Sequence, residues 1–220
     1  MSSLTAFLTA ALGIAPRNVA LYERALTHGS YGDTDYQRLE FLGDRVLGLV
    51  IAHWLYMDFP SDKEGQLSAR LNNLVRGETC ALVARAIKLQ PHLKLGKQAR
   101  DDGAFESDNV LGDVCEALIG ALMLDHGLAA AEGFIRAQWA EIVTGQVSAP
   151  RHPKSALQEW AAAHNRKTPV YTITDRSGPA HAPRFTITVS LGSAGEASAQ
   201  GASKQEAETA AAAALLEKLL

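Results

Sequence analysis

Hydrophobic side chains cover nearly every direction of one predicted helix, which begins at Gln37 and runs to about Tyr56. Between residues 37 and 50 the apolar positions leave little polar face: Leu39, Phe41, Leu42, Val46, Leu47, Leu49 and Val50. Such a helix is normally buried. It nevertheless carries Glu40 and Asp44, and a spacing of four residues places both carboxylates on one face. A buried carboxylate must be protonated, paired or bound to a cation.

A second apolar stretch, residues 109–122, repeats this combination with Asp113 and Glu116 three residues apart. Small residues lie beside the acids of the two stretches: Gly43, Ala117 and Gly120. They allow two helices to approach closely and to bring four carboxylates together. Ligands that are all oxygen favour a hard divalent cation, Mg²⁺ or Mn²⁺. The alternative is two ordinary acid pairs on solvated helix faces, which the apolar surroundings and the repetition disfavour.

The remainder of residues 1–146 has helical periodicity and no convincing strand pattern, so this part is predicted to be all-helical. Arg70 is predicted to be solvated, or to touch a phosphate, and residues 95–103 are predicted to be a polar, mobile segment. His28 either closes a helix or lies near the acids. The other helices are predicted over residues 4–12, 18–26, 67–75, 79–87 and 128–143.

The hydrophobic pattern changes after residues 147–153, where prolines and small residues predict a flexible linker. Residues 154–220 then predict the order α-β-β-β-α. Alternation of period two marks the strands, and a capping box from Ser203 to Glu206 opens an alanine-rich final helix. The elements of this part are predicted over residues 154–164, 169–174, 184–191, 196–200 and 203–220.

Composition and charge narrow the possibilities only a little. A chain of 220 residues with 47% hydrophobic and 20% charged residues is typical of a folded protein of one or two domains. Cys80 and Cys115 lie in apolar helical patterns and are predicted to be buried free thiols. The net charge of −3 does not favour a nucleic-acid binder, although residues 151–220 hold eight basic and six acidic side chains. Motifs must therefore decide the function.

Residues 37–50 resemble the signature segment of the bacterial ribonuclease III family, and residues 109–122 resemble its second acidic motif. The resemblance implies a helical endonuclease domain that depends on Mg²⁺, for which Mn²⁺ can substitute. It implies that Asp44 and Glu116 are catalytic and that four acids hold the metal: Glu40, Asp44, Asp113 and Glu116. This sequence departs from the family pattern at two positions. Gln37 stands where the family usually has Glu, and Gly112 stands where Ala is common. Only the change at Gln37 is expected to affect function.

The pattern of residues 154–220 resembles the double-stranded-RNA-binding domain. This resemblance implies that Gln158 and His181 enter two minor grooves, and that Lys204 faces phosphates across the major groove between them. The physics agrees, because the N-terminus of a helix favours an anion and A-form RNA is recognised by backbone and 2′-hydroxyl groups. Gln205 stands where the family often has a second Lys, which predicts weaker binding that is less sensitive to salt. The alternative for Lys204 is a solvated lysine.

The family resemblance implies hydrolysis of double-stranded RNA to staggered ends with 5′-phosphate and 3′-hydroxyl groups, in rRNA and mRNA processing and decay. It implies a homodimer with Phe41 at the contact, although Phe41 can equally be a core residue. A catalytically silent RNA-binding regulator is the first alternative. A di-iron carboxylate protein is the second, but it needs Glu-x-x-His pairs, which these acids lack. Without a membrane span or charged secretory leader, the chain is expected in the cytoplasm.

Overall fold

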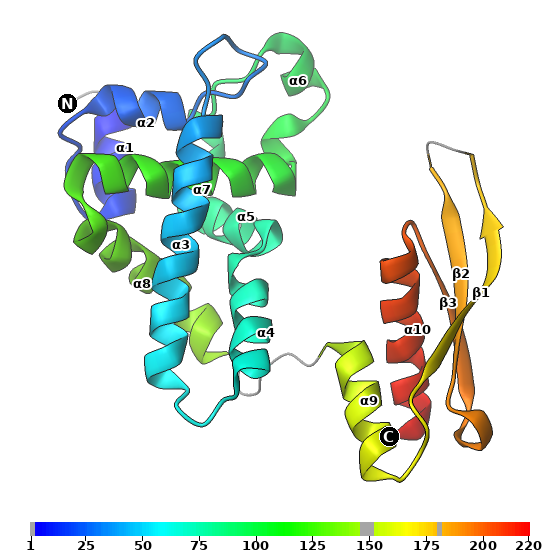
Figure 1. Cartoon of the computed structure of the whole chain (residues 1–220). Coiled ribbons are helices and arrows are strands. Elements are labelled where there is room, and N and C mark those ends of the chain that lie inside the picture. Colours follow the sequence, from blue (N-terminus) through cyan, green and yellow to red (C-terminus); the bar gives the residue numbers. More distant parts are fainter. Residues whose placement is uncertain (1–2, 146–151, 180–181) are drawn as a thin grey trace. The chain divides into compact units, whose positions relative to one another are not determined.

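The computed structural model describes residues 3–145, 152–179 and 182–220. The chain divides into two compact units, Met1–Pro150 and Arg151–Leu220. Figure 1 shows a helical first unit and a second unit in which helices pack on a three-stranded sheet. The predicted fold class is therefore confirmed. The predicted linker, residues 147–153, lies largely outside the described residues.

The described part of the first unit consists of helices, with an isolated backbone bridge between Thr27 and Lys94. Its α-helices are α1 Ser3–Leu12, α2 Val19–Ala25, α3 Gln37–Asp58, α4 Glu64–Val75, α5 Gly77–Ala86, α6 Lys97–Asp101, α7 Asp108–His126 and α8 Leu128–Thr144. Its 3-10 helices are η1 Gln90–His92 and η2 Ala104–Glu106. Among the described helices, none combines the length and apolar character that crossing a membrane requires.

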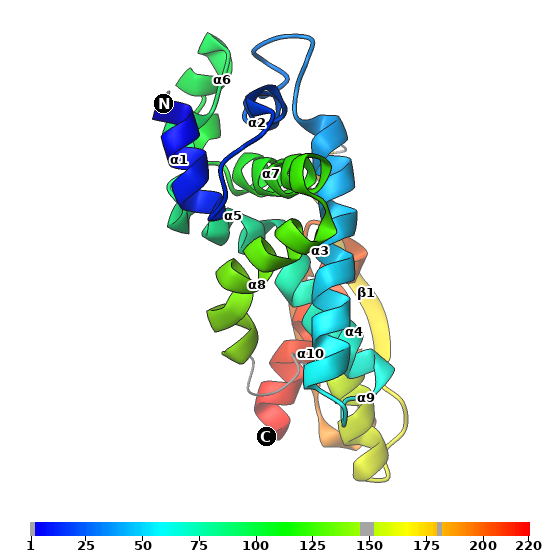
Figure 2. The ribbon, with the colours of Figure 1, turned by 90° about the vertical axis from the view of Figure 1, so that its left-hand side faces the viewer.

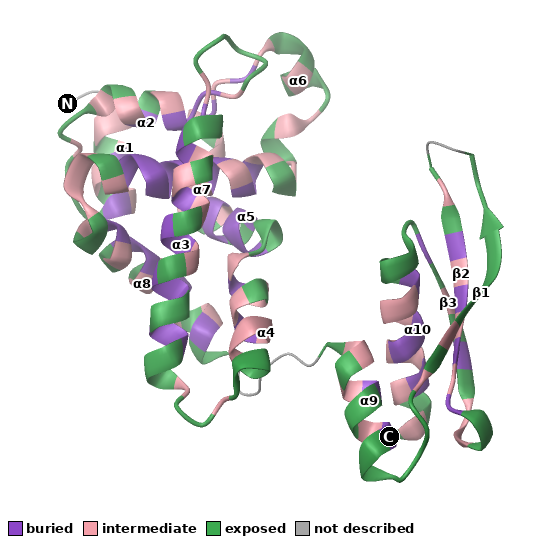
Figure 3. Cartoon of the chain, in the orientation of Figure 1, coloured by how far each residue is buried: buried purple, intermediate pink, exposed green. Residues whose placement is uncertain are grey.

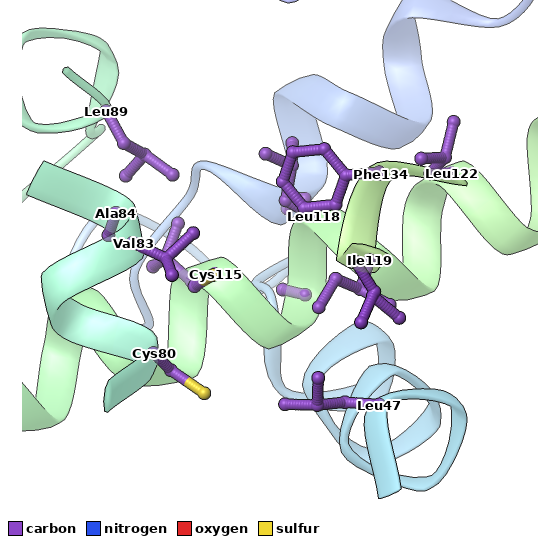
Figure 4. Close-up of a cluster of buried hydrophobic side chains, with 14 of the residues drawn as sticks. Leu47, Cys80, Val83, Ala84, Leu89, Cys115, Leu118, Ile119, Leu122 and Phe134 are labelled. Carbon is purple, nitrogen blue, oxygen red and sulfur yellow. The ribbon is translucent and has the colours of Figure 1, made fainter. Parts of the chain in front are cut away.

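Helix α7 lies at the centre of the first unit, with other helices on several sides (Figure 2). Most of its length is buried in Figure 3, and the close-up in Figure 4 shows its side chains meeting those of α5 and α3. Its fully buried residues include Leu111, Val114, Cys115, Leu118, Ile119 and Leu122. Burial of a large aliphatic side chain contributes about 1.5–3 kcal/mol. This helix therefore anchors the core, and its acids stand on a rigid element.

Helix α3 is buried on one face only, which corrects the prediction of burial on all sides. Leu47 and Ile51 are fully buried, but Phe41 is 67% exposed. The other large apolar residues exposed on this helix are Leu49, Tyr56 and Met57. Some apolar residues of α3 therefore form an outer face that is exposed to solvent. Phe41 belongs to this face, so the alternative that Phe41 is a core residue is wrong.

The polar segment 95–103 contains the short helix α6, with Gly96 before it and Gly103 in a left-handed conformation (φ 79°) after it. The expectation that Arg70 is solvated was wrong, because Arg70 is buried. Its Nε donates to Asp62 at 2.7 Å, and its guanidinium lies 3.8 Å from the centroid of the Phe59 ring. These partners lie beyond the helix that carries Arg70, so helical periodicity gives no sign of them.

The second unit follows the predicted element order. Helices α9 Pro153–Ala163 and α10 Lys204–Leu219 pack together, and α10 packs on an antiparallel sheet. The strand order of this sheet is β1-β2-β3. The strands are β1 Val170–Ser177, β2 Arg184–Ser190 and β3 Glu196–Gly201, with the 3-10 helix η3 Gly192–Ala194 between β2 and β3. Strand β1 extends past the predicted end because a register shift between Ile173 and Asp175 interrupts its alternation and pairing then continues.

Candidate functional site

The acids stand where α3 crosses α7, and the two helices touch there through their backbones. A Cβ atom added to Gly43 would lie 1.7 Å from the carbonyl oxygen of Glu116. A Cβ atom added to Gly120 would lie 2.2 Å from the carbonyl oxygen of Leu39. Only glycine permits this approach. The prediction that small residues bring the two acidic helices together is therefore confirmed.

Three of the four predicted acids affect one another across this crossing. Burial, followed by the charges of Glu40 and Asp113, raises the pKa of Glu116 to about 7. Burial and then the charge of Asp113 raise the pKa of Glu40. Burial also raises the pKa of Asp113. The carboxylate charges that raise the pKa values of Glu40 and Glu116 concentrate negative charge here, which a cation would relieve.

The fourth acid, Asp44, is occupied by its neighbour in the chain. Arg45 forms an ion pair with Asp44, whose side chain is 35% exposed. The guanidinium of Arg45 also lies 5.4 Å from the centroid of the Phe41 ring. Asp44 therefore has a cationic partner that the other three acids lack among the ion pairs formed by the described residues.

The four acids do not form a closed metal shell in this conformation. In the described part of the chain, no three His, Cys, Asp or Glu side chains gather closely enough to hold a metal ion. The chemistry of the side chains still fits a hard divalent cation, because they offer only carboxylate oxygens in a partly buried, negative environment.

Tyr36 is a site residue that the sequence did not predict. Its hydroxyl donates to Oδ2 of Asp113 at 3.0 Å, and its side chain is buried just before α3 begins. Burial and the charge of Asp113 raise the pKa of Tyr36. Burial raises the pKa of Asp113, whereas the hydrogen bond from Tyr36 lowers it. Tyr36 therefore connects the first turn of α3 to an acid of α7.

His28 satisfies both alternatives left open by the sequence. The backbone N–H of Ser30 donates to its Nδ1 at 3.0 Å, so His28 closes the turn after α2. Its ring centroid is also 5.8 Å from that of Tyr36. The charge of its protonated form lowers the pKa of Asp113. His28 therefore lies behind Tyr36, close enough to affect the acids.

Cys80 approaches the acids from α5. Its Sγ lies 3.8 Å from Oε1 of Glu116, and both Cys80 and Cys115 are buried and free, as predicted. The thiol contact lowers the pKa of Glu116, although burial and the neighbouring acids outweigh it. Gly112 adds another close approach, because a Cβ there would lie 2.8 Å from the carbonyl oxygen of Gly77. Helix α5 therefore packs tightly behind Glu116.

The predicted RNA-contacting residues of the second unit are at the surface where they are described. Gln158 on α9 and Lys204 at the start of α10 are both exposed. Ser203 accepts the N–H of Glu206 at 3.1 Å, so half of the predicted capping box is present as expected. The carboxylate of Glu206 accepts the N–H of Ala202 at 2.8 Å, one residue before the expected donor. His181 lies outside the described residues.

Comparisons with known proteins agree with both halves of this description. Residues 18–142 match the family model described as Ribonuclease-III-like, and residues 153–219 match the model of the double-stranded RNA binding motif. A Ribonuclease 3 of Zymomonas mobilis subsp. mobilis is 65% identical over 208 residues, which cover 94% of this chain and 85% of that protein. A Ribonuclease 3 of Caulobacter vibrioides is 49% identical over 204 residues, 90% of this chain and 88% of that protein.

A solved structure resembles the first unit. The nuclease domain of ribonuclease III from Campylobacter jejuni matches 61% of this chain and 95% of its own, at 32% identity and a TM-score of 0.60. The crossing of two acidic helices, the family models and the curated relatives thus point the same way. The chain belongs to the ribonuclease III family of endoribonucleases, and its nuclease domain is followed by a double-stranded RNA binding motif.

Proposed function

We propose that this protein hydrolyses phosphodiester bonds of double-stranded RNA in a Mg²⁺-dependent reaction at the crossing of α3 and α7. The residues that would hold the cation are Glu40, Asp44, Asp113 and Glu116, and Mn²⁺ can replace Mg²⁺. When bound, the cation would lower the pKa of a coordinated water and polarise the phosphoryl group. The observation that carries this proposal is the crossing itself, where backbone contact at Gly43 brings Glu40 of α3 towards Asp113 and Glu116 of α7.

The chain's own residues prepare the acids for this role. The hydroxyl of Tyr36 fixes the orientation of Asp113, and the thiol of Cys80 contacts Glu116. The backbone contact at Gly43 holds α3 against α7, so that Glu40 lies close enough to Asp113 for their charges to interact. Asp44 and Glu116 are the acids we assign to catalysis itself. Attack of water on the phosphorus with departure of the 3′ oxygen breaks the P–O3′ bond, so the expected products carry 5′-phosphate and 3′-hydroxyl ends.

Replacing Tyr36 by Phe tests whether this hydroxyl positions Asp113. The variant keeps the ring and removes only the donated bond, which is 3.0 Å long. Loss of a partner that orients a metal ligand commonly lowers metal affinity or activity by about 10–100-fold. We expect cleavage to fall within that range and to recover partly at higher Mg²⁺ concentration. Tyr31→Phe, on an exposed tyrosine, is the control. An unchanged Mg²⁺ dependence would exclude this role for Tyr36.

The second unit is expected to supply most of the affinity for duplex RNA, through Gln158, His181 and Lys204. Lys204→Ala should weaken binding for all duplex sequences, because a phosphate contact carries no sequence information. The slope of log affinity against log salt concentration should fall by about one. Lys218→Ala is a matched control at the other end of α10. Equal losses in the two variants would show that Lys204 has no special contact.

Cleavage of both RNA strands requires two sites, which we expect a homodimer to provide. The exposed ring of Phe41 on α3 supports such a contact, since an exposed aromatic side chain gains free energy when it is buried. The Campylobacter jejuni nuclease-domain structure is described as flexible in a region involved in dimer formation. Two sites related by a twofold axis would give staggered ends.

Incubation with a plain RNA duplex tests the reaction directly. We expect Mg²⁺-dependent fragments with 5′-phosphate and 3′-hydroxyl ends, and no fragments in excess EDTA. Mapping the two strands separately would reveal the stagger. Duplex binding without cleavage would instead support the silent regulator. The expected setting is rRNA and mRNA processing and decay in the cytoplasm.

A further inference from the structure

Arg45 is a basic residue at the edge of the acidic site whose role the proposed reaction does not explain. It follows Asp44 directly in α3, and its side chain is 66% exposed. Its guanidinium pairs with Asp44 and also lies over the ring of Phe41, 5.4 Å from the centroid. A mostly exposed arginine has many alternative positions in solvent. Its position on an acid of the site therefore indicates a specific attraction.

The charge of Arg45 also reaches the second acidic helix. Its charge attracts the Glu116 carboxylate, whereas the charges of Glu40 and Asp113 repel that carboxylate. Arg45 thus acts on α3 by direct contact with Asp44 and on α7 through its charge. It partly neutralises the carboxyl cluster from inside the chain.

We infer that Arg45 is the internal counter-ion of the acidic site, and that a divalent cation must compete with it for Asp44. This inference rests on the proposed metal site. An oxygen of Asp44 held by a guanidinium has to give up a charge-assisted hydrogen bond before it can bind a cation. In addition, the positive charge of Arg45 repels any cation that approaches Glu116.

The Phe41 ring lowers the free energy needed to move the guanidinium of Arg45 away from Asp44. When the guanidinium leaves Asp44, it keeps the cation–π contact with the Phe41 ring, which at exposed sites contributes about 0.5–1 kcal/mol. Arg45 therefore has a second partner beside the site.

Arg45→Gln removes the charge while keeping a residue of similar helix propensity. The experiment measures Mn²⁺ binding to RNA-free protein, by the electron paramagnetic resonance signal of free Mn²⁺. We expect the variant to bind Mn²⁺ about tenfold more tightly, the order expected when a unit charge near a divalent ion is removed at a protein surface. Arg45→Lys keeps the charge and should stay closer to the wild-type affinity. Arg100→Gln removes an exposed charge from α6 and should change nothing.

The outcomes separate this inference from the proposed function. Tighter binding by R45Q alone supports the inference, since a merely structural role would weaken binding. Wild-type affinity in R45Q, with saturable binding that E116Q loses, overturns the inference and leaves the metal site standing. Equal tightening in R45Q and R45K, or in R45Q and R100Q, also overturns it. Absence of saturable Mn²⁺ binding in the wild-type protein overturns the inference together with the metal site.

Discussion

Replacing Glu116 by Gln is expected to abolish cleavage of duplex RNA in Mg²⁺ while duplex binding survives. The neutral amide removes one of four carboxylates from the proposed site, whereas the predicted RNA contacts belong to the other unit. Loss of an outer-shell partner of a metal commonly costs about 10–100-fold, so losing a direct ligand should cost more than about 100-fold. Cleavage gels measure the first effect, and gel-shift titration with the same duplex measures the second.

Stability measurements distinguish lost chemistry from lost folding in this variant. The pKa of Glu116 is raised to about 7 because burial, and then the charges of Glu40 and Asp113, disfavour its charged form. Gln removes that repulsion, so E116Q should unfold in EDTA at the same temperature as wild type or higher. Glu141→Gln, on the exposed side of α8, is the control for loss of a carboxylate. Full activity of E116Q in Mg²⁺ would remove Glu116 from the metal site.

Gly43→Ala should destabilise the first unit and disable the site together. The added Cβ would lie 1.7 Å from the carbonyl oxygen of Glu116 and 2.5 Å from its carbonyl carbon. Neither atom belongs to a side chain that can rotate away, so α3 and α7 must separate. Overpacking in a core costs about 1–3 kcal/mol, and a backbone clash should reach or exceed the upper end of that range. Thermal unfolding and cleavage assays of the full chain measure the two effects.

Gly48→Ala is the matched control, because it lies on the same helix with open space around its Cβ position. Alanine is favoured over glycine inside a helix by about 0.5–1 kcal/mol. Gly48→Ala should therefore leave the unfolding temperature unchanged or raise it slightly, with activity retained. An unfolding temperature in Gly43→Ala equal to that of Gly48→Ala would contradict the backbone contact at the crossing.

The sequence predicted those features that local patterns encode. Helical periodicity located α3 and α7, alternation located the central strand, and glycines beside acids predicted the crossing. These signals depend on residues close together in the chain, whose geometry is regular within one element. Both acidic helices could therefore be found before any coordinates were known.

Features that depend on distant partners could not be predicted in this way. Tyr36 looked like an ordinary aromatic residue, because its bond to Asp113 joins residues far apart in the sequence. Arg70 looked solvated, because Asp62 and Phe59, which hold it in the core, precede its helix. Phe41 belonged to an apolar pattern in which exposed and buried positions look alike. A tyrosine directly before an acidic helix was the only available hint of the Asp113 contact.

Direct contact between main chains at Gly43 and Gly120 determines how the site can respond to a ligand. At that point backbone atoms of the two helices are in contact, with no side chain between them. Neither helix can therefore slide along the other without atomic overlap. Any rearrangement between a cation-free and a cation-loaded state is therefore confined to rotation about side-chain bonds. Such rotations take picoseconds to nanoseconds at exposed positions, much faster than relative movements of helices. Metal exchange at this crossing should therefore proceed without a slow conformational phase.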